Sequence, residues 1–195
     1  MSKEVNLDID GYNVRYFEEG TGKPVIILHG ASFSAEVWVK TGTMEAIAKS
    51  GWKSISVDMP GFGKTERNGY DTVASFLDRF FKKLDIEKAV IAGASLGGRE
   101  ALAFSIKYPQ RVIGLILIGA ASVWMYEDML KIIKEVPALL IWGSEDNISP
   151  KENYKMLMKY LSNSRLAIIG KIHPCYLEEP VKFNRAISDF LKSIS

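Results

Sequence analysis

The chain has 195 residues, of which 47% are hydrophobic and 25% charged, the balance of a folded globular protein rather than of a disordered or fibrous one. Its 25 basic and 23 acidic side chains leave a net charge of only +2, and they are interspersed along the chain. Nucleic-acid-binding proteins gather positive charge in a block or on one face, so we expect no nucleic-acid partner. The length suits one well-filled domain, predicted to span residues 1–195.

The apolar segments and the cysteine content bear on the compartment of the protein. The longest uncharged apolar stretch, residues 112–125, is too short to span a bilayer, and the first six residues resemble no signal peptide. The single cysteine, Cys175, cannot form a disulfide within the chain and is interpreted as a packing residue. We therefore expect a cytoplasmic protein with no membrane span.

Short apolar runs alternate along the chain with longer segments of helical period. Two strands, 5–9 and 12–17, flank Asp10-Gly11, a dipeptide that favours a hairpin turn. Further strands are expected at 25–28, 54–57, 89–92, 115–118, 138–142 and 166–169, and helices near 35–50, 72–84, 97–108, 124–134, 150–161 and 180–194.

Most of the later strand runs do not alternate apolar with polar residues, which indicates a sheet covered on both faces. Strands and helices that alternate after an opening hairpin predict the α/β class: a mostly parallel central sheet with an N-terminal hairpin and helices on both faces. In such sheets functional residues collect at the carboxyl ends of the strands. These ends are therefore the place to look for chemistry.

A nucleophile candidate follows the strand at 89–92. Residues 93–98 (GASLGG) match G-x-S-x-G and lead directly into a predicted helix, the context of a nucleophile elbow. The turn is so sharp that side chains two positions before and after the serine would collide, and Gly93 and Gly97 remove them. Ser95 is therefore predicted to be the nucleophile. The alternative is a glycine-rich turn that holds a serine by chance.

A serine hydroxyl needs a base to take its proton, and histidine is the usual one near neutral pH. Of the two histidines, His29 ends the strand at 25–28 and is interpreted as structural, shaping the loop beside the nucleophile. His173 follows the last apolar run, in a loop from which it can reach Ser95. We predict His173 as the base, and an exposed loop histidine is the alternative.

An acid is needed to fix the tautomer of the imidazole and to stabilise its charged form. Asp146 lies four residues past the strand at 138–142, with Glu145 and Asp58 as competing candidates. The chain order of serine, aspartate and histidine is one of the known triad orders, so we predict Asp146 as the acid. The alternative for Asp146 is a turn or helix-cap residue.

Acyl transfer also needs two backbone N–H groups directed at the oxygen that becomes negative. One is predicted at Leu96, directly after the nucleophile. The other is predicted at Ala31, because Gly30 permits the bend that would turn this N–H inward, and Ser32 is the competitor.

Together these motifs resemble the α/β-hydrolase superfamily, from about residue 10 to the end of the chain. They are His29-Gly30, residues 58–65 (DMPGFGKT), residues 93–98, residues 143–146 and His173. Within the superfamily, residues 28–38 and 173–177 look like the small lid-less serine hydrolases of the abhydrolase-14 type. One departure is Thr65, where many relatives have serine, at a position that is usually structural.

The resemblance implies an α/β-hydrolase fold, a triad of Ser95, Asp146 and His173, no cofactor, and activity toward small acyl esters. The cysteine and histidines show no metal-ligand spacing, so we expect no metal. Many α/β-hydrolases carry a cap domain, but residues 119–137, where it would be inserted, leave room for one helix only. We therefore expect no cap, and a shallow pocket for a short acyl chain or for an acyl group presented on something larger.

Four side chains are predicted to line this pocket, Phe33, Phe62, Trp124 and Met125, with ordinary packing as the alternative for each. The leading hypothesis is a carboxylesterase-like serine hydrolase that acts on a small-molecule ester through an acyl-enzyme on Ser95. The same triad would serve a thioesterase, an amidase or deacetylase, or a peptidase, because specificity lies in the pocket. A non-catalytic ligand-binding homologue is the remaining hypothesis.

Overall fold

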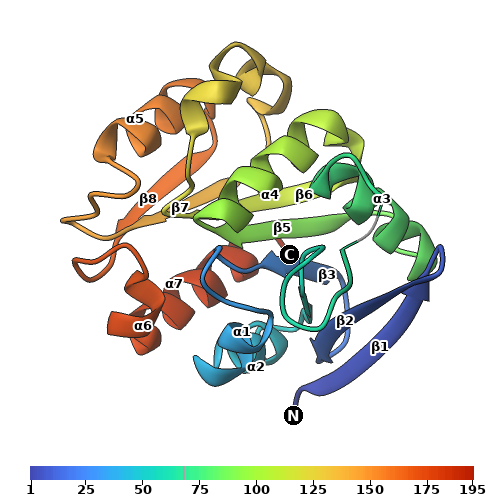
Figure 1. The fold of residues 1–195 in the computed structure, drawn as a ribbon. Coiled ribbons are helices and arrows are strands. Elements are labelled where there is room, and N and C mark those ends of the chain that lie inside the picture. Colours follow the sequence, from blue (N-terminus) through green and yellow to red (C-terminus); the bar gives the residue numbers. More distant parts are fainter. Residues whose placement is uncertain (68) are drawn as a thin grey trace.

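The computed structural model describes residues 1–67 and 69–195, and its strands form one eight-stranded sheet in the order β1-β2-β4-β3-β5-β6-β7-β8 (Figure 1). The strands are β1 Lys3–Ile9, β2 Tyr12–Glu19, β3 Pro24–Leu28, β4 Lys53–Val57, β5 Ala89–Ala94, β6 Val112–Ile118, β7 Ala138–Trp142 and β8 Ser164–Ile168. β2 pairs antiparallel with β1 and β4, and the other neighbours pair parallel. The predicted mostly parallel sheet with an N-terminal hairpin is confirmed.

The turn of this hairpin follows from its two central residues. Ile9 pairs with Tyr12, so the loop consists of Asp10 and Gly11, whose φ angles are 54° and 86°. Two successive positive φ values match the type I′ turn, whose twist suits that of the paired strands and which favours Asp-Gly. The turn predicted at Asp10-Gly11 is confirmed.

Helices cover both faces of the sheet, as predicted (Figure 1). On one face lie α1 Glu36–Lys40, α2 Thr43–Lys49, α6 Cys175–Glu178 and α7 Pro180–Ser193, and on the other α3 Val73–Lys83, α4 Leu96–Lys107, the 3-10 helix η2 Val123–Ile133 and α5 Lys151–Tyr160; η1 is a 3-10 turn at Pro109–Arg111. Each face has its own buried cluster, and one strand supplies both: Ile26 and Leu28 of β3 join one cluster, Val25 and Ile27 the other. No helix in the described part of the chain is long and apolar enough to cross a membrane.

Two of the predicted helices differ from the observed ones. The helix expected at 35–50 is divided into α1 and α2 at Gly42, whose φ of 71° lies in the left-handed region and ends the helical run. The segment expected as a helix at 124–134 is the more tightly wound 3-10 helix η2. Because η2 is the helix between β6 and β7, the prediction that no cap domain is inserted there is confirmed.

Parallel pairing brings the carboxyl ends of β3, β4, β5, β7 and β8 to one edge of the sheet. The loops that follow these strands carry, in chain order, His29, Asp58, Ser95, Asp146 and His173. Residues far apart in the sequence are therefore collected along a single edge, where ligands of open α/β sheets bind.

Candidate active site

Ser95 occupies the turn between β5 and α4, with φ of 53° and ψ of −113°, a strained backbone conformation for a residue other than glycine. The glycines around it are required by close backbone contacts. A Cβ atom on Gly93 would overlap the carbonyl oxygen of Gly97, and one on Gly97 would lie 2.5 Å from the carbonyl oxygen of His29. The turn holds the half-buried serine at the amino end of α4, where the helix dipole favours negative charge.

Asp146 and His173 form a hydrogen-bonded pair in the loops after β7 and β8. Nδ1 of His173 lies 2.7 Å from Oδ2 of Asp146, and the two side chains are 14% and 1% exposed. An ionised carboxylate only accepts hydrogen bonds, so Nδ1 is the donor and Nε2 is left as the acceptor of the ring. Nε2 is buried and has no hydrogen-bond partner among the residues that the structure describes, the hydroxyl of Ser95 included. This nitrogen is therefore free to take a proton.

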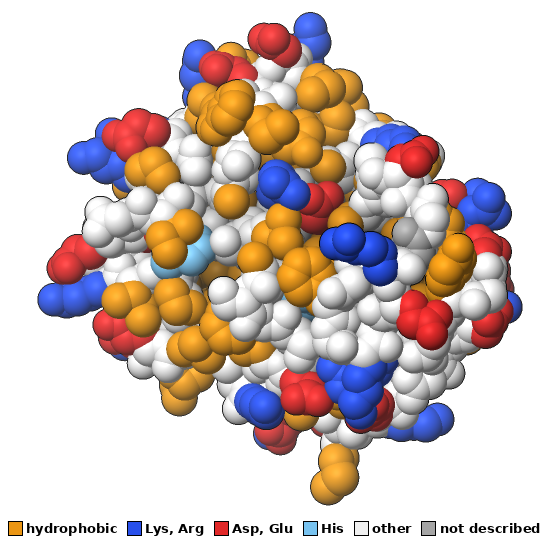
Figure 2. Space-filling view, in the orientation of Figure 1, with side chains coloured by type: hydrophobic (Ala, Val, Ile, Leu, Met, Phe, Trp, Pro, Cys, Tyr) orange, Lys and Arg blue, Asp and Glu red, His pale blue; other side chains and the backbone are white. Residues whose placement is uncertain are grey.

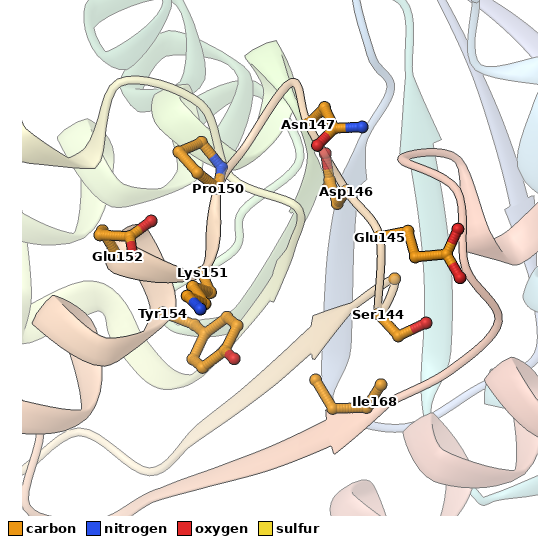
Figure 3. Close-up of a pocket in the computed structure, with 10 residues that line it drawn as sticks. Ser144, Glu145, Asp146, Asn147, Pro150, Lys151, Glu152, Tyr154 and Ile168 are labelled. Atoms are coloured by element: carbon orange, nitrogen blue, oxygen red, sulfur yellow. The ribbon is translucent and has the colours of Figure 1, made fainter.

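The loop after β7 separates Asp146 from its competitor Glu145. Glu145 is exposed, and its Oε1 lies 3.4 Å from Nζ of Lys171. A cavity of about 380 Å³ lies beside this loop, lined by residues 143–147, by the start of α5 and by Ile168 of β8 (Figure 3). Among the described residues that line it is the aspartate, but neither the serine nor the histidine. The cavity thus lies beside the loop of residues 143–150, called here the acid loop, and away from the serine and the histidine.

Both ring nitrogens of His29 are used in hydrogen bonds within the fold, which agrees with the interpretation of this histidine as structural. It is fully buried, and Nε2 accepts a hydrogen bond from the backbone N–H of Met59 at 3.1 Å. Nδ1 then carries the proton and donates to the carbonyl oxygen of Gly30 at 2.8 Å. Burial lowers the pKa of this imidazole, and the half-buried ring of Phe62 packs edge-on against it at 5.2 Å between centroids. Neither nitrogen is left for catalysis.

Asp58, the other competing acid, is also fully engaged. Its oxygens accept hydrogen bonds from Nε of Arg15 at 2.7 Å and from the backbone N–H groups of Ala35 and Lys64 at 2.7 and 2.8 Å. Asp58 and Arg15 are both buried, at 0% and 2% exposure. Oγ1 of Thr65 accepts from the backbone N–H of Arg15 at 2.9 Å, so this departure from the family pattern keeps a structural hydroxyl.

The amide groups predicted to hold an oxyanion lie in neighbouring loops. Leu96 begins α4 directly after the serine, and Ala31 follows Gly30, on which a Cβ atom would lie 3.7 Å from Cβ of Ser95. The N–H groups of Ala31 and Leu96 donate to no acceptor among the described residues. Both are thus available to a bound oxygen.

The predicted pocket residues fall into different surroundings. Phe33 lines a hollow of about 490 Å³ together with Val37 of α1 and Leu177 of α6. Trp124 and Met125 stand out from η2, with 67% and 52% of their surface exposed. Figure 2 shows hydrophobic side chains gathered over η2 and in a band near α6 on the same face of the molecule. The structure does not bring all four predicted side chains into one described cavity.

Cys175 lies two residues after the histidine but is fully buried. Burial, and secondarily the negative charge of Asp146, raises the pKa of its thiol to about 12, so the nucleophilic thiolate is disfavoured. This supports its interpretation as a packing residue. In the part of the chain that the structure describes, no group of three His, Cys, Asp or Glu side chains is arranged to hold a metal ion.

Three residues next to the acid–base pair belong to none of the sequence motifs. Gly119 lies against it, since a Cβ atom there would be 3.0 Å from Oδ2 of Asp146. Ser149 donates its backbone N–H to Oδ1 of Asp146 at 2.8 Å, and Asn153 donates to the hydroxyl of Ser149 at 2.9 Å. A glycine directly after an apolar run was the available signal for Gly119. Ser149 and Asn153 flank Pro150 and look like ordinary turn and helix-start residues.

With this geometry established, comparison with known proteins places the chain. The protein-family model described as the alpha/beta hydrolase fold matches residues 23–132 of the sequence. The chain belongs to the α/β-hydrolase family. A solved structure of a predicted CIB-like hydrolase from Thermoplasma acidophilum matches it with a TM-score of 0.93, at 30% identity over 99% of both chains.

Among curated proteins, this hydrolase is similar to the human "Putative protein-lysine deacylase ABHD14B", at 28% identity over 98% of its own chain and 96% of that protein. It is also 28% identical to human ABHD14A over 86% of its length, and there it spans 63% of the relative, just under two thirds. The predicted superfamily and its abhydrolase-14-like branch are confirmed.

Proposed function

We propose that this hydrolase is a serine esterase that cleaves short-chain carboxylic esters through an acyl-enzyme on Ser95. The observation that carries the proposal is the buried, unpartnered Nε2 of His173, whose opposite nitrogen is hydrogen-bonded to Asp146. A neutral imidazole in this tautomer is a general base, and the carboxylate stabilises the positive charge that the ring gains.

In the first half-reaction, Nε2 of His173 takes the proton of the Ser95 hydroxyl as its oxygen attacks the ester carbonyl carbon. The carbonyl oxygen becomes negative and is held by the N–H groups of Ala31 and Leu96, which lack other acceptors among the described residues. The tetrahedral intermediate then releases the alcohol, which leaves with the proton from His173. The acyl group remains bonded to the serine oxygen.

In the second half-reaction water takes the place of the alcohol. Nε2 of His173 removes a proton from water, whose oxygen attacks the acyl carbon, and the same two N–H groups hold the new oxyanion. Collapse releases the carboxylic acid, and the proton returns from the histidine to the serine oxygen. The cycle regenerates the starting protonation of the histidine and needs no cofactor.

The short acyl chain is proposed because no cap domain is inserted between β6 and β7. That connection is η2, on which Trp124 and Met125 are largely exposed. Phe33 and Phe62, from the loops after β3 and β4, and Trp124 and Met125, from η2, are proposed to contact the substrate. The substrate is proposed to be a small-molecule acyl ester, and the protein is proposed to act in the cytoplasm.

A second candidate is the amide bond of an acylated lysine. It is favoured by the similarity to ABHD14B, whose printed name is that of a protein-lysine deacylase. The same nucleophile, base and oxyanion groups would act, with the lysine amine as the leaving group that takes the proton from His173. A site without a cap domain would also admit an acyl group carried on a protein.

The test is hydrolysis of 4-nitrophenyl esters from acetyl to dodecanoyl by wild type and by Ser95→Ala, with an acetyl-lysine peptide beside them. Ser105→Ala is the matched control, since Ser105 is a buried serine of α4 whose hydroxyl donates to the carbonyl of Ala101. We expect activity to peak at short chains, to fall at least about 1,000-fold in Ser95→Ala and to persist in Ser105→Ala.

Undiminished turnover by Ser95→Ala would refute the serine mechanism. Cleavage of the peptide without cleavage of any ester would select the lysine amide, and a preference for dodecanoyl would contradict the short-chain pocket. Tight ligand binding without hydrolysis, and without labelling by a serine-directed phosphonate, would instead indicate a binding protein.

A further inference from the structure

The carboxylate of Asp146 is held at both of its oxygens. Oδ2 accepts from Nδ1 of His173 at 2.7 Å, and Oδ1 accepts from the backbone N–H groups of Ile148 and Ser149 at 2.9 and 2.8 Å. The carboxylate cannot turn without giving up one of these sets of hydrogen bonds. Its direction toward the histidine therefore depends on where the backbone of Ser149 lies.

Buried side chains fix that backbone to a neighbouring segment. Oγ of Ser149 donates to the carbonyl oxygen of Ala120 at 2.6 Å, and Nδ2 of Asn153 donates to Oγ of Ser149 at 2.9 Å and to the same carbonyl at 3.3 Å. The carbonyl of Ser149 accepts from Nε1 of Trp142 at 2.9 Å. Ser149 and Ala120 are fully buried and Asn153 is 8% exposed, so bulk water does not compete for these bonds. We call Ser149, Asn153 and the Ala120 carbonyl the acid-loop clamp.

The segment that receives the clamp touches both halves of the candidate site. A Cβ atom on Gly119 would lie 3.0 Å from Oδ2 of Asp146 and 3.1 Å from Nδ1 of His173. Two residues later, the backbone N–H of Ala121 donates to the carbonyl oxygen of Ser95 at 3.1 Å. Residues 119–121 therefore contact both the nucleophile turn and the acid–base pair. The clamp ties the acid loop to this segment.

We propose that Ser149 and Asn153 are positioning residues that set where His173 stands relative to Ser95. This inference rests on the proposed function, since it concerns the same nucleophile and base. Proton transfer depends steeply on the separation of the atoms involved, so a small shift of the acid loop slows catalysis. Both side chains are buried and neither is proposed to contact the substrate, so their loss should lower kcat and leave KM nearly unchanged.

The first experiment compares Ser149→Ala and Asn153→Ala with the matched control Ser105→Ala in 4-nitrophenyl acetate hydrolysis. Each clamp variant should lower kcat by about 10- to 100-fold with KM within about 2-fold of wild type. Ser105→Ala should change neither constant by more than about 2-fold, although it also removes a buried hydroxyl that donates to a carbonyl. Ser149→Thr, which retains the hydroxyl, should recover most of the rate.

A second experiment asks whether the clamp acts through Asp146. In an Asp146→Asn background the direction of the carboxylate no longer matters, so adding Ser149→Ala should lower kcat by less than about 2-fold. The same 10- to 100-fold loss in both backgrounds would overturn the proposal, because it would mean that the clamp supports the site by some other route.

A third measurement does not require activity. The chain has two histidines, and in each the Nδ1 proton is hydrogen-bonded: in His173 to Asp146 and in His29 to Gly30. Nitrogen-15 NMR of the imidazoles should show the Nδ1–H resonance of His173 shifted or broadened in folded Ser149→Ala and Asn153→Ala. The resonance of His29 should stay in place and serves as the internal reference.

These readouts separate failure of this inference from failure of the proposed function. Wild-type kcat together with an unchanged His173 resonance in both folded variants would overturn the inference and leave the esterase proposal intact. A wild-type protein that hydrolyses nothing, but whose His173 resonance responds to both variants, would support the positioning role and refute the esterase.

Discussion

Two histidine–aspartate neighbourhoods lie at the carboxyl edge of the same sheet, and they differ in what their polar atoms have left to bind. Around His29 and Asp58, both ring nitrogens and both carboxylate oxygens already have partners within the protein. Around Asp146 and His173 the carboxylate is equally engaged, but Nε2 of the ring has no partner among the described residues. All of these polar atoms are hydrogen-bonded in the first neighbourhood, and in the second the Nε2 atom of His173 lacks a hydrogen bond.

The difference shows how to tell a structural histidine from a candidate base when both are buried at strand ends. A polar network in which every atom is hydrogen-bonded stabilises the fold and leaves no atom to bind a substrate or a proton. A buried acceptor without a partner costs stability, and such a cost points to a functional role. The two neighbourhoods should therefore respond in opposite ways to mutation, one in stability and the other in activity.

The largest effect is expected for His173→Ala. Removal of the base should lower kcat/KM for a short-chain nitrophenyl ester by about 1,000-fold or more, because the serine hydroxyl would have no proton acceptor. The free energy of unfolding should change by no more than about 2 kcal/mol, since one hydrogen bond to Asp146 is lost. Ester hydrolysis and urea unfolding on the same sample measure both. Activity within 10-fold of wild type would place the base elsewhere.

Next in size is Asp58→Ala, which removes the buried carboxylate from the guanidinium of Arg15 and leaves it only the more exposed Glu36 at 2.8 Å and Glu4 at 3.9 Å. Loss of one member of a buried ion pair should lower the free energy of unfolding by about 3–5 kcal/mol, measured by urea titration. The control is Glu45→Ala, which removes an exposed ion pair with Lys49 on α2 and should leave the midpoint unchanged within error. Equal midpoints for the two variants would contradict the structural role of Asp58.

The smallest effect concerns pH and His29. Because burial lowers the pKa of His29 in the folded protein, the unfolded chain binds the proton more readily. Stability from this residue is fully present above the unfolded pKa of about 6.5 and is lost as the pH falls toward the lower, folded pKa. The free energy of unfolding should thus decline from pH 7 to pH 5.5, and less so in His29→Asn. An identical decline in the variant would assign the effect to other groups.

Local patterns predicted the elements that depend on neighbouring residues. The Asp10-Gly11 turn needs only two residues that tolerate positive φ, and the elbow at Ser95 needs glycines at 93 and 97. Buried parallel strands can be predicted because most of them are runs of apolar residues. The separation of α1 from α2 was missed because a single glycine is also tolerated inside a helix, and only its left-handed φ shows that Gly42 ends one.

The polar contacts that position the site could not be predicted in the same way. The acid-loop clamp joins residues from three segments, and its members Ser149 and Asn153 are indistinguishable in sequence from surface turn residues. Arg15 lies in β2, the second strand of the hairpin, yet its burial becomes apparent only when Asp58 is folded against it. Satisfaction of buried polar groups is a property of the assembled structure, so sequence patterns carry little signal for it.

The position of β8 at the end of the sheet affects how the candidate active site is lost when the protein begins to unfold. β8 pairs with β7 alone, two of its residues, Arg165 and Ile168, are exposed and none is fully buried, and the loop that carries His173 follows it. Edge strands with few buried contacts open in local fluctuations at free energies well below that of global unfolding. Such an opening would withdraw the histidine while the central strands, and the serine turn on β5, stay folded. On heating, the proposed hydrolytic activity would then be lost when this one strand opens, several degrees below the temperature at which circular dichroism detects a loss of structure.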